Sequence, residues 1–300
     1  MAASLVPGDN VSGPHPGIAV VLVNWRAAAM TLRAVDLAFA QSRPPDHVFV
    51  VDNGSADGSA ERLACGLAAH AGRATLIVND RNKGFGGGCN PAIEAALTAG
   101  YVYLWLLNND AEPEPDCLAA LLRAAEAASE PVGAVGSLLL DPTGRQAPHF
   151  GSWMRAASLT CGGVARPADL DHRYAWCTAA SLLLNAQAIK KIGGFDEGFF
   201  MYWEDADLNM RLREGGYRLL CAEDARVAHG AGTSSASIPV QRYLWHFDSQ
   251  RRFLHKHHRH PRVAVPLLRA KFLLKALYDG DGLRFRALIS RLRGVKGNPE

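Results

Sequence analysis

The sequence predicts an α/β fold with a single, mainly parallel sheet flanked by helices and a helical, basic extension at the C-terminus. Three observations lead to this expectation. Before Asp110, short apolar runs and helical patterns alternate four times, which is typical of a parallel sheet with right-handed crossovers. Each run ends in a polar or glycine-bearing loop, as strands do in ligand-binding α/β sheets. After Arg242 the pattern becomes helical and rich in Lys, Arg and His.

The composition is that of an ordinary globular protein. Of the 300 residues, 48% are hydrophobic and 20% are charged, which suits one large domain with an appendage. The six cysteines are scattered without a CxxC pair, so a reducing cytoplasm fits better than a disulfide framework or a zinc site. Residues 1–16 lack the basic and apolar segments of a signal peptide, and we expect a flexible tail. No run approaches the roughly 18 apolar residues of a membrane span.

Four predicted strands precede Asn108, each apolar and rich in β-branched or aromatic residues. Helical patterns separate them. The third helix is expected to begin at Pro91, where a missing N–H costs nothing, with Asn90 as its N-cap. We expect strands at 18–23, 47–51, 74–78 and 101–107, and helices at 27–40, after a cap at Asp57 or Ser59, and from Pro91.

The pattern after Asp110 is less regular. The stretch 145–171 has no clean period and is rich in Gly, Pro and Ala, so we expect irregular structure that faces a ligand. The other expected elements are a helix from Pro115 to about Ser129, strands at 132–140 and 178–184, a helix at 186–192 stopped by Gly193-Gly194, and strand-like segments at 217–221 and 227–228.

The fourth strand ends in Asn108, Asn109 and Asp110, at the sheet edge where open α/β folds bind ligands. A carboxylate there can hold Mg²⁺ or Mn²⁺ against a diphosphate, because these cations prefer oxygen ligands. The alternative is that Asp110 caps the next helix or turn. His229 stands in a second loop of this kind and would be the second metal ligand; its alternative role is structural.

The glycine-rich segment that follows the third strand predicts an anion or sugar site. Four glycines in five positions, starting at Gly84, remove Cβ atoms where a backbone approaches a ligand, and Lys83 adds a cation. A purely structural loop remains an alternative. A dinucleotide-binding fold would need G-x-G-x-x-G directly after the first strand, which this chain lacks. Asp52, at the end of the second strand, could accept the imide N–H of a pyrimidine or a ribose hydroxyl, or form an Asx-turn.

A third motif joins aromatic residues to acids. In 194–216, Tyr202 and Trp203 end an aromatic run and are expected to form a wall for a sugar ring. Glu204 and Asp205 follow where helical spacing begins, so the helix dipole would favour them. A carboxylate within reach of a bound hydroxyl is also a general base.

The C-terminal segment is strongly basic. From Arg242 to Lys296 there are fourteen Lys and Arg against three Asp, a charge of +11, which leaves −8 for the rest of the chain. An apolar stripe from Leu267 to Leu277, flanked by basic residues, suits a helix on an anionic membrane surface. The alternatives are a helical lid or a dimer surface. Nucleic-acid binding is not favoured, because no recognised module for it is present.

The chain resembles the family-2 inverting glycosyltransferases, in particular the rhamnosyltransferase-like branch of bacterial envelope enzymes. The resemblance extends from about Ile18 to Ser235 and implies a single-domain, Rossmann-like nucleotide-diphosphosugar transferase fold of the GT-A type. On this reading 1–16 form the tail, 17–238 the catalytic domain and 239–300 the basic helical extension. Four motifs carry the resemblance, in this order: VDNGSADGS, NKGFGGGCN, NND and GFDEGFFMYWEDADLNMRLREGGY.

The resemblance also implies roles for individual residues. Asp205 would activate the acceptor, with Glu204 as the alternative, and Asp110 would bind a divalent cation, Mg²⁺ or Mn²⁺, together with His229. Asn108 stands where the family pattern has the first acid of Asp-x-Asp, so one charge is missing. Asp52 would read the pyrimidine base, and the donor would also be lined by Asn24, Lys83, Gly84, Phe85, Gly86, Asn90, Asn108 and Asn109.

These expectations combine into one function. The protein would transfer a hexosyl group, in first place L-rhamnosyl from dTDP-rhamnose, to a hydroxyl of an envelope or exopolysaccharide glycan or of a lipid-linked acceptor. A UDP-hexose donor is the alternative within this reaction. From other classes, a nicotinamide-dependent oxidoreductase would need NAD at the glycine segment, and a non-catalytic sugar-binding protein would need Asp205 to be dispensable. The oligomeric state is not predicted.

Overall fold

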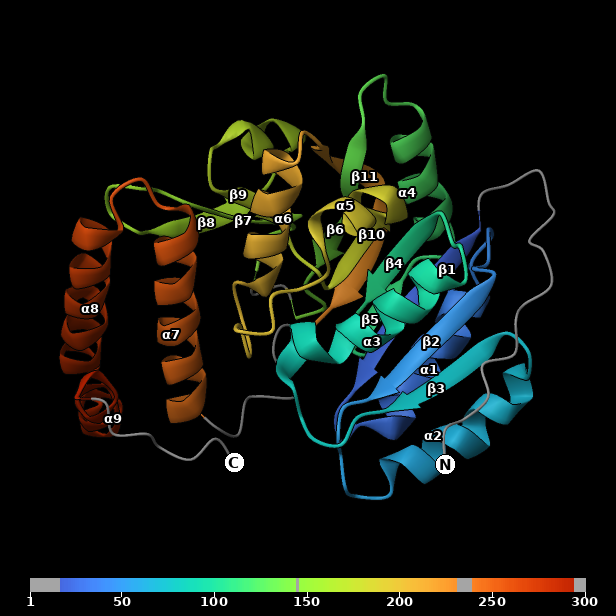
Figure 1. The fold of residues 1–300 in the computed structure, drawn as a ribbon, viewed down its shortest axis with the longest axis horizontal. Helices are drawn as coiled ribbons and strands as arrows, with labels where there is room; N and C mark the ends of the chain where they lie inside the picture. Colours follow the sequence, from blue (N-terminus) through green and yellow to red (C-terminus); the bar gives the residue numbers. More distant parts are fainter. Residues whose placement is uncertain (1–16, 144–145, 231–238, 294–300) are drawn as a thin grey trace.

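The computed structural model describes residues 17–143, 146–230 and 239–293. The expected tail at 1–16, the Gly/Ser segment from position 231 and Lys296 lie outside the described residues. An α/β body carries three further helices on one side (Figure 1). The expected α/β fold with a mainly parallel sheet is confirmed.

The main sheet has eight strands in the order β3-β2-β1-β4-β10-β6-β11-β5. The first four are mutually parallel, whereas β10 runs antiparallel to both of its neighbours, β4 and β6. The sheet is therefore parallel on both sides of β10, apart from the short edge strand β5, which runs antiparallel to β11. The bounds are β1 Ile18–Asn24, β2 His47–Asp52, β3 Ala74–Val78, β4 Tyr103–Leu107, β5 Ala111–Pro113, β6 Val132–Leu140, β10 Ser181–Asn185 and β11 Arg218–His229.

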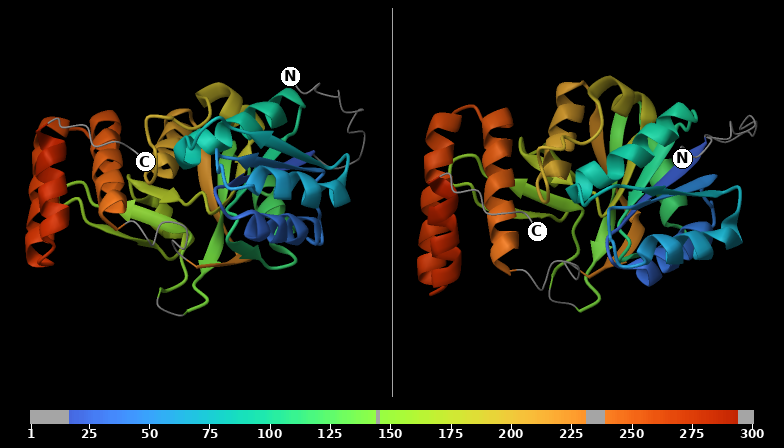
Figure 2. Two further views of the ribbon diagram at one scale, coloured as in Figure 1. Left: turned by 90° about the horizontal axis from the view of Figure 1, so that it is seen from below. Right: turned by 60° about the horizontal axis from the view of Figure 1, so that its bottom comes forward.

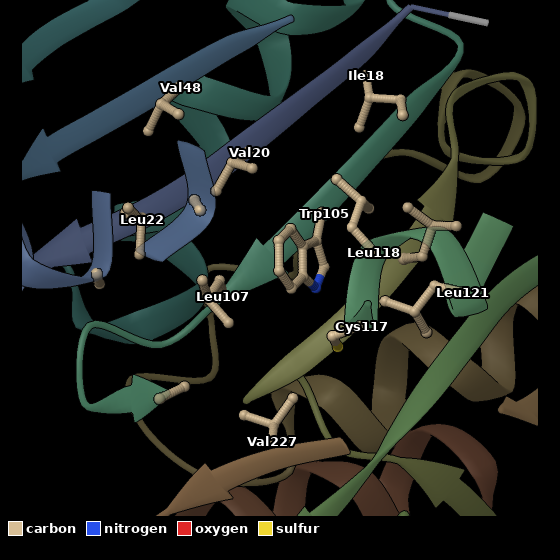
Figure 3. Packing of buried hydrophobic residues seen from close by; sticks show 14 of the residues in the cluster. Ile18, Val20, Leu22, Val48, Trp105, Leu107, Cys117, Leu118, Leu121 and Val227 are labelled. Carbon is tan, nitrogen blue, oxygen red and sulfur yellow. The ribbon is translucent and has the colours of Figure 1, made fainter. Parts of the chain in front are cut away.

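Helices cover both faces of this sheet. On one face α1, α2 and α4 bury a cluster with the aliphatic side chains of β1 and β2 around Trp105 (Figure 3). On the other face α3, α5 and α6 pack against the alternate side chains of the same strands. Both faces are apolar because parallel strands between two helical layers have no wet side. The helices are α1 Ala28–Phe39, α2 Ser59–Leu67, α3 Gly84–Thr98, α4 Cys117–Glu126, α5 Ala186–Ile192 and α6 Glu204–Glu214.

The start of α3 differs from the prediction. The helix begins at Gly84, not at Pro91, which lies inside it. Asn90 is therefore not an N-cap; its side chain bonds Phe195 and Glu197 instead. The glycines are helical because the helix packs closely here: a Cβ at Gly86 would lie 2.8 Å from the Cβ of Phe195. Close packing of the first turns thus outweighs the cost of glycine and of an internal proline.

Two further predictions need correction. The stretch 145–171 is not irregular throughout: it contains β7 Gly151–Met154 and β8 Cys161–Val164, and these form a small antiparallel sheet with β9 Ala175–Cys177. The segments 217–221 and 227–228 belong to one strand, β11, whose pairing with β6 shifts register between Ala222 and Arg226. That irregularity explains the polar interruption in its sequence. At the start of α2, Asp57 accepts a bond from the Ser59 N–H, and Gly58 occupies the cap position.

The C-terminal segment forms α7 Pro239–His257, α8 Pro261–Tyr278 and α9 Gly282–Leu292. The first of these helices joins the main body. Phe253, fully buried on α7, contacts Trp203 at a ring distance of 5.0 Å and Tyr174 at 6.1 Å. In Figure 2, α7 lies between the α/β body and α8. No helix of the described chain is long and apolar enough to cross a membrane.

Candidate active site

One cleft of about 1460 Å³ collects loops from distant parts of the chain. It lies at the carboxyl ends of β1, β2 and β4, where open α/β sheets bind ligands. The small sheet, the start of α6 and the first turns of α7 complete it. Most predicted site residues line it: Lys83, Gly84, Phe85, Asn108, Asn109, Asp110, Tyr202, Trp203, Glu204, Asp205 and His229.

Asp110 and His229 meet on one side of the cleft. His229 Nε2 lies 3.2 Å from Asp110 Oδ1 and 3.2 Å from the Asn108 amide nitrogen. Two ligands on adjacent corners of an octahedral Mg²⁺ or Mn²⁺ shell, each about 2.1 Å from the ion, are roughly 3 Å apart. The pair therefore fits as two ligands, with substrate oxygens left to supply others. Within the described residues, no three His, Cys, Asp or Glu side chains gather as a metal site.

Glu204 and Asp205 begin α6 at another side of the cleft. Glu204 is 7% exposed, and its Oε2 has no hydrogen-bond partner among the described residues. Burial, and then the charge of Asp205, raise the pKa of Glu204 to about 8. Asp205 is better supported, because its carboxylate accepts bonds from the backbone N–H groups of Ala206 and Ala179 at 2.8 and 3.4 Å. Burial raises the pKa of Asp205 as well, and these hydrogen bonds, which favour its charged form, oppose that rise.

The two residues before these acids adopt an unusual backbone. Tyr202 and Trp203 have φ of +68° and +67°, a region that costs non-glycine residues about 1–3 kcal/mol each. The surroundings hold this turn in place: Trp203 packs against Trp176 at 5.1 Å, and the Tyr202 hydroxyl accepts from Arg242 at 3.0 Å. Such a turn places both acids at the first turn of the helix, facing the cleft.

The glycine segment touches the acid-bearing loop directly. The backbone N–H of Phe85 donates to the carbonyl of Phe200 at 3.0 Å. Gly84 has φ +76°, and a Cβ there would overlap that same carbonyl. Glycine is therefore required at position 84 for the loop before α3 and the loop before α6 to meet.

Asn24 and Asp52 do not line the cleft, contrary to prediction. Both are at most 2% exposed. The Asp52 carboxylate accepts from the Asn24 amide at 2.7 Å and from the hydroxyl and N–H of Ser55, so the Asx-turn alternative describes it. Their neighbours Trp25, Arg26, Asn53 and Gly54 line the cleft instead.

Gly86 and Asn90 also lie away from the cleft. They face the loop that carries Phe195, as described above. Their role in donor binding stays a prediction. The aromatic wall needs revision as well: Trp203 is 4% exposed and sits in a buried cluster, whereas Tyr202 and Phe200 are only half-buried and line the cleft.

Several cleft residues were not predicted. Arg242, Trp245 and His246 reach it from α7, which the sequence placed in a separate extension. Their i,i+3,i+4 spacing on a helix was visible, but it does not say which partner that face meets. Ser152 and Trp176 reach it from the small sheet, whose strands are too short for a clear alternation.

Comparisons with known proteins identify the family of the chain. Residues 19–152 match the model of glycosyl transferase family 2. An N-acetylglucosaminyl-diphospho-decaprenol L-rhamnosyltransferase from Mycobacterium tuberculosis is 30% identical over 246 residues, covering 74% of this chain and 78% of the relative. A galactofuranosyltransferase from Mycolicibacterium smegmatis is 27% identical over 221 residues, covering 72% of each chain.

The fold is shared with solved transferases. A mannosyltransferase from Pyrobaculum calidifontis, in complex with GDP-mannose and Mn²⁺, superposes with a TM-score of 0.58 over 93% of this chain and 80% of its own. The sequence identity is 17%, so this likeness concerns the fold alone.

The buried Glu204 makes stability depend on pH. Because its pKa is raised in the folded state, that state binds more protons than the unfolded chain between about pH 4.5 and 8, and the free energy of unfolding falls as pH rises through this window. Glu204→Gln keeps the shape of the protonated acid and removes this term. We expect Tm to fall less between pH 5 and pH 8 in the variant than in the wild type, by about 2–6 °C. Thermal unfolding followed by circular dichroism measures it.

Glu61→Gln, on the exposed side of α2, serves as the control and is expected to follow the wild type. If Glu204→Gln shows the wild-type pH profile, the Glu204 carboxyl is not held protonated in the folded protein.

Proposed function

The chain belongs to the family-2 glycosyltransferases, and from this premise we propose that it transfers a hexosyl group, L-rhamnosyl first, from a nucleotide-diphosphate sugar to an acceptor hydroxyl with inversion. The acceptor would be an envelope or exopolysaccharide glycan or a lipid-linked saccharide. The name of the 30% identical relative, a rhamnosyltransferase acting on a diphospho-decaprenol-linked sugar, supports this choice.

One observation carries the proposal: the Asp110–His229 pair and the Asp205 carboxylate line the same cleft. They come from the end of β4, the end of β11 and the start of α6. A donor diphosphate at the first pair and an acceptor hydroxyl at Asp205 can therefore approach one sugar. Separate clefts would have been incompatible with a direct displacement.

The residues divide into two tasks. Asp110 and His229, with Asn108 beside them, would hold the divalent cation, which supplies neutralisation of the charge on the leaving diphosphate. Lys83 lines the cleft from the loop before α3 and adds a cation for the same group. With Asp52 buried, Trp25 and Arg26 are the side chains available to the nucleotide base near β1.

Asp205 would take the proton of the acceptor hydroxyl as that oxygen attacks the anomeric carbon from the face opposite the diphosphate. The bond from sugar to diphosphate breaks as the new glycosidic bond forms, so no covalent enzyme intermediate is needed. Glu204, protonated and with one oxygen unpartnered, can donate to a sugar hydroxyl beside it.

The donor is tested by ligand-induced stabilisation. A selective ligand at 100 times its Kd adds about 2.7 kcal/mol to the free energy of unfolding. We expect dTDP-rhamnose with Mn²⁺ to raise Tm more than UDP-hexoses do, NAD to have no effect, and a chelator to diminish the shift. The galactofuranosyltransferase relative is the reason to include UDP-sugars. A larger shift with a UDP-hexose would replace the donor assignment, and a shift with NAD would revive the oxidoreductase.

Asp205→Asn tests the general base. The amide keeps the shape and cannot accept a proton, so we expect kcat to fall about 10²- to 10⁴-fold, while the donor-induced rise in Tm persists. Product formation from radiolabelled donor measures the first quantity. Asp36→Asn, exposed on α1, is the matched control. Full activity in Asp205→Asn would remove the assignment of Asp205 as the general base.

We also place the proposed enzyme on an anionic membrane surface. On α8 and α9 six large apolar side chains are 49–92% exposed, and basic residues stand among them. Apolar insertion combined with attraction to anionic lipid is the usual physics of interfacial helices. The exposed residues are Val263, Leu267, Leu274, Leu277, Tyr278 and Leu283.

Vesicle flotation tests this surface. The wild type is expected to float with vesicles containing anionic lipid, and less with neutral ones. Leu274→Ser with Leu277→Ser should reduce flotation several-fold. Val78→Ser, which changes an equally exposed apolar residue on β3, should not. Equal flotation of all variants, or none, would contradict the membrane assignment in favour of a lid or a dimer surface.

A further inference from the structure

Arg242 is a cation in the cleft that the chemistry above leaves unused. Its Nε donates to the Tyr202 hydroxyl at 3.0 Å, and it forms no ion pair with any described carboxylate. The other Arg and Lys residues of α7 are all paired: Arg251 with Asp248 at 3.4 Å, and Arg252 and Lys256 with Asp196 at 2.8 and 2.6 Å. The one α7 cation that lines the cleft is thus the one whose charge is not offset within the described chain.

Aromatic rings accompany Arg242 on the same wall. One turn along α7, Trp245 contacts the ring of Phe200 at 4.8 Å and lines the cleft. His246 stacks on Tyr202 at 4.4 Å with the ring planes 20° apart. Trp245 is half-buried, so part of its ring faces the cleft. A rigid, partly exposed indole beside a cation can hold the apolar face of a sugar whose substituent is an anion.

The cleft also has room for a second ligand. Its 1460 Å³ exceeds the roughly 300–1,000 Å³ of a site for one small ligand. The donor side has its own groups for a diphosphate, namely the Asp110–His229 pair and Lys83. Arg242 comes from a different element, and its partner Tyr202 stands three residues before Asp205.

We propose that Arg242 and Trp245 form the acceptor subsite: Arg242 binds a diphosphate that joins the accepting sugar to its lipid, and Trp245 stacks on that sugar. This inference rests on the proposed function, because it uses the hydroxyl that Asp205 deprotonates. It adds that the enzyme recognises the acceptor by its anionic linkage, through the C-terminal extension.

The position of α7 agrees with a lipid attached to that diphosphate. Tyr243, next to Arg242, is buried against Phe272 of α8 at a ring distance of 4.9 Å, and Arg284 of α9 lies over its ring at 5.5 Å. The first turns of α7 are therefore packed against the α8–α9 pair with its exposed apolar residues. In Figure 1, α9 lies beside the lower end of α7, where this helix begins.

Equilibrium binding tests the subsite without requiring turnover. The probes are farnesyl-diphospho-N-acetylglucosamine and, as its uncharged counterpart, octyl N-acetylglucosaminide. Arg242→Gln should raise the Kd of the diphosphate probe about 10- to 100-fold, because hydrogen bonds to a charged group are lost, and leave that of the uncharged probe unchanged. Trp245→Ala should weaken both. Arg251→Gln, on the same helix but outside the cleft, should alter neither.

Donor binding is measured in parallel by the Tm shift with dTDP-rhamnose. If Arg242→Gln reduces that shift, Arg242 serves the donor and the inference falls while the transferase function stands. If the wild type binds both acceptor probes equally well, or binds neither, the diphosphate subsite is wrong. If the probes bind as expected but no glycosyl transfer occurs with any donor, the proposed function fails and the anion site remains.

Discussion

The site depends on the ion pairs of the buried Asp207 carboxylate, which join α6 to α7. This carboxylate is fully buried on α6, and Arg211, His257 and Lys256 surround it at 2.8, 2.8 and 2.5 Å. Burial alone would raise the pKa of Asp207, but these partners hold it below its usual value. Removing the only partner of a buried charge typically costs about 3–5 kcal/mol, and Asp207 has three such partners. The helix bearing Glu204 and Asp205 is thereby fastened to α7, and the extension belongs to the architecture of the cleft.

The surroundings of α6 also stabilise the turn that precedes it and set the pKa values of its first two acids. Two aromatic residues in left-handed conformation precede a helix whose first two side chains are adjacent carboxyls. The left-handed turn costs free energy, and the two carboxyls repel each other when both are charged. Aromatic packing of Trp203 and the hydrogen bond to Tyr202 stabilise the turn. Burial raises the pKa of both acids, and the backbone hydrogen bonds to the Asp205 carboxylate oppose that rise, whereas Oε2 of Glu204 has no partner among the described residues. A single environment thus provides both a proton acceptor and a hydrogen-bond donor.

Much of the main sheet was predictable, because continuous apolar runs such as 132–140 have few alternatives to a buried strand. The reversed strand β10 was not, since hydrophobicity carries no direction. The start of α3 was predicted wrongly at Pro91, because close packing around Gly86 outweighs the preference of proline for the first turn of a helix. In the site, Asp110 and His229 are in contact, and Asp205 lines the same cleft. Asp52 and Asn24 look like ligand residues in sequence but bond each other. Arg242 and Trp245 were missed because the spacing of residues on a helix face does not indicate which part of the protein that face contacts.

The hydrogen bond between Phe85 and Phe200 connects the two halves of the cleft. It ties the main chain beside the donor groups to the main chain that leads into the acids. The two segments are in close contact at Gly84, where a Cβ would overlap the Phe200 carbonyl. A sugar nucleotide that shifts the first segment would therefore displace the second. Occupancy of one half of the cleft is therefore coupled to the alignment of the other, and by thermodynamic linkage this coupling acts equally in both directions.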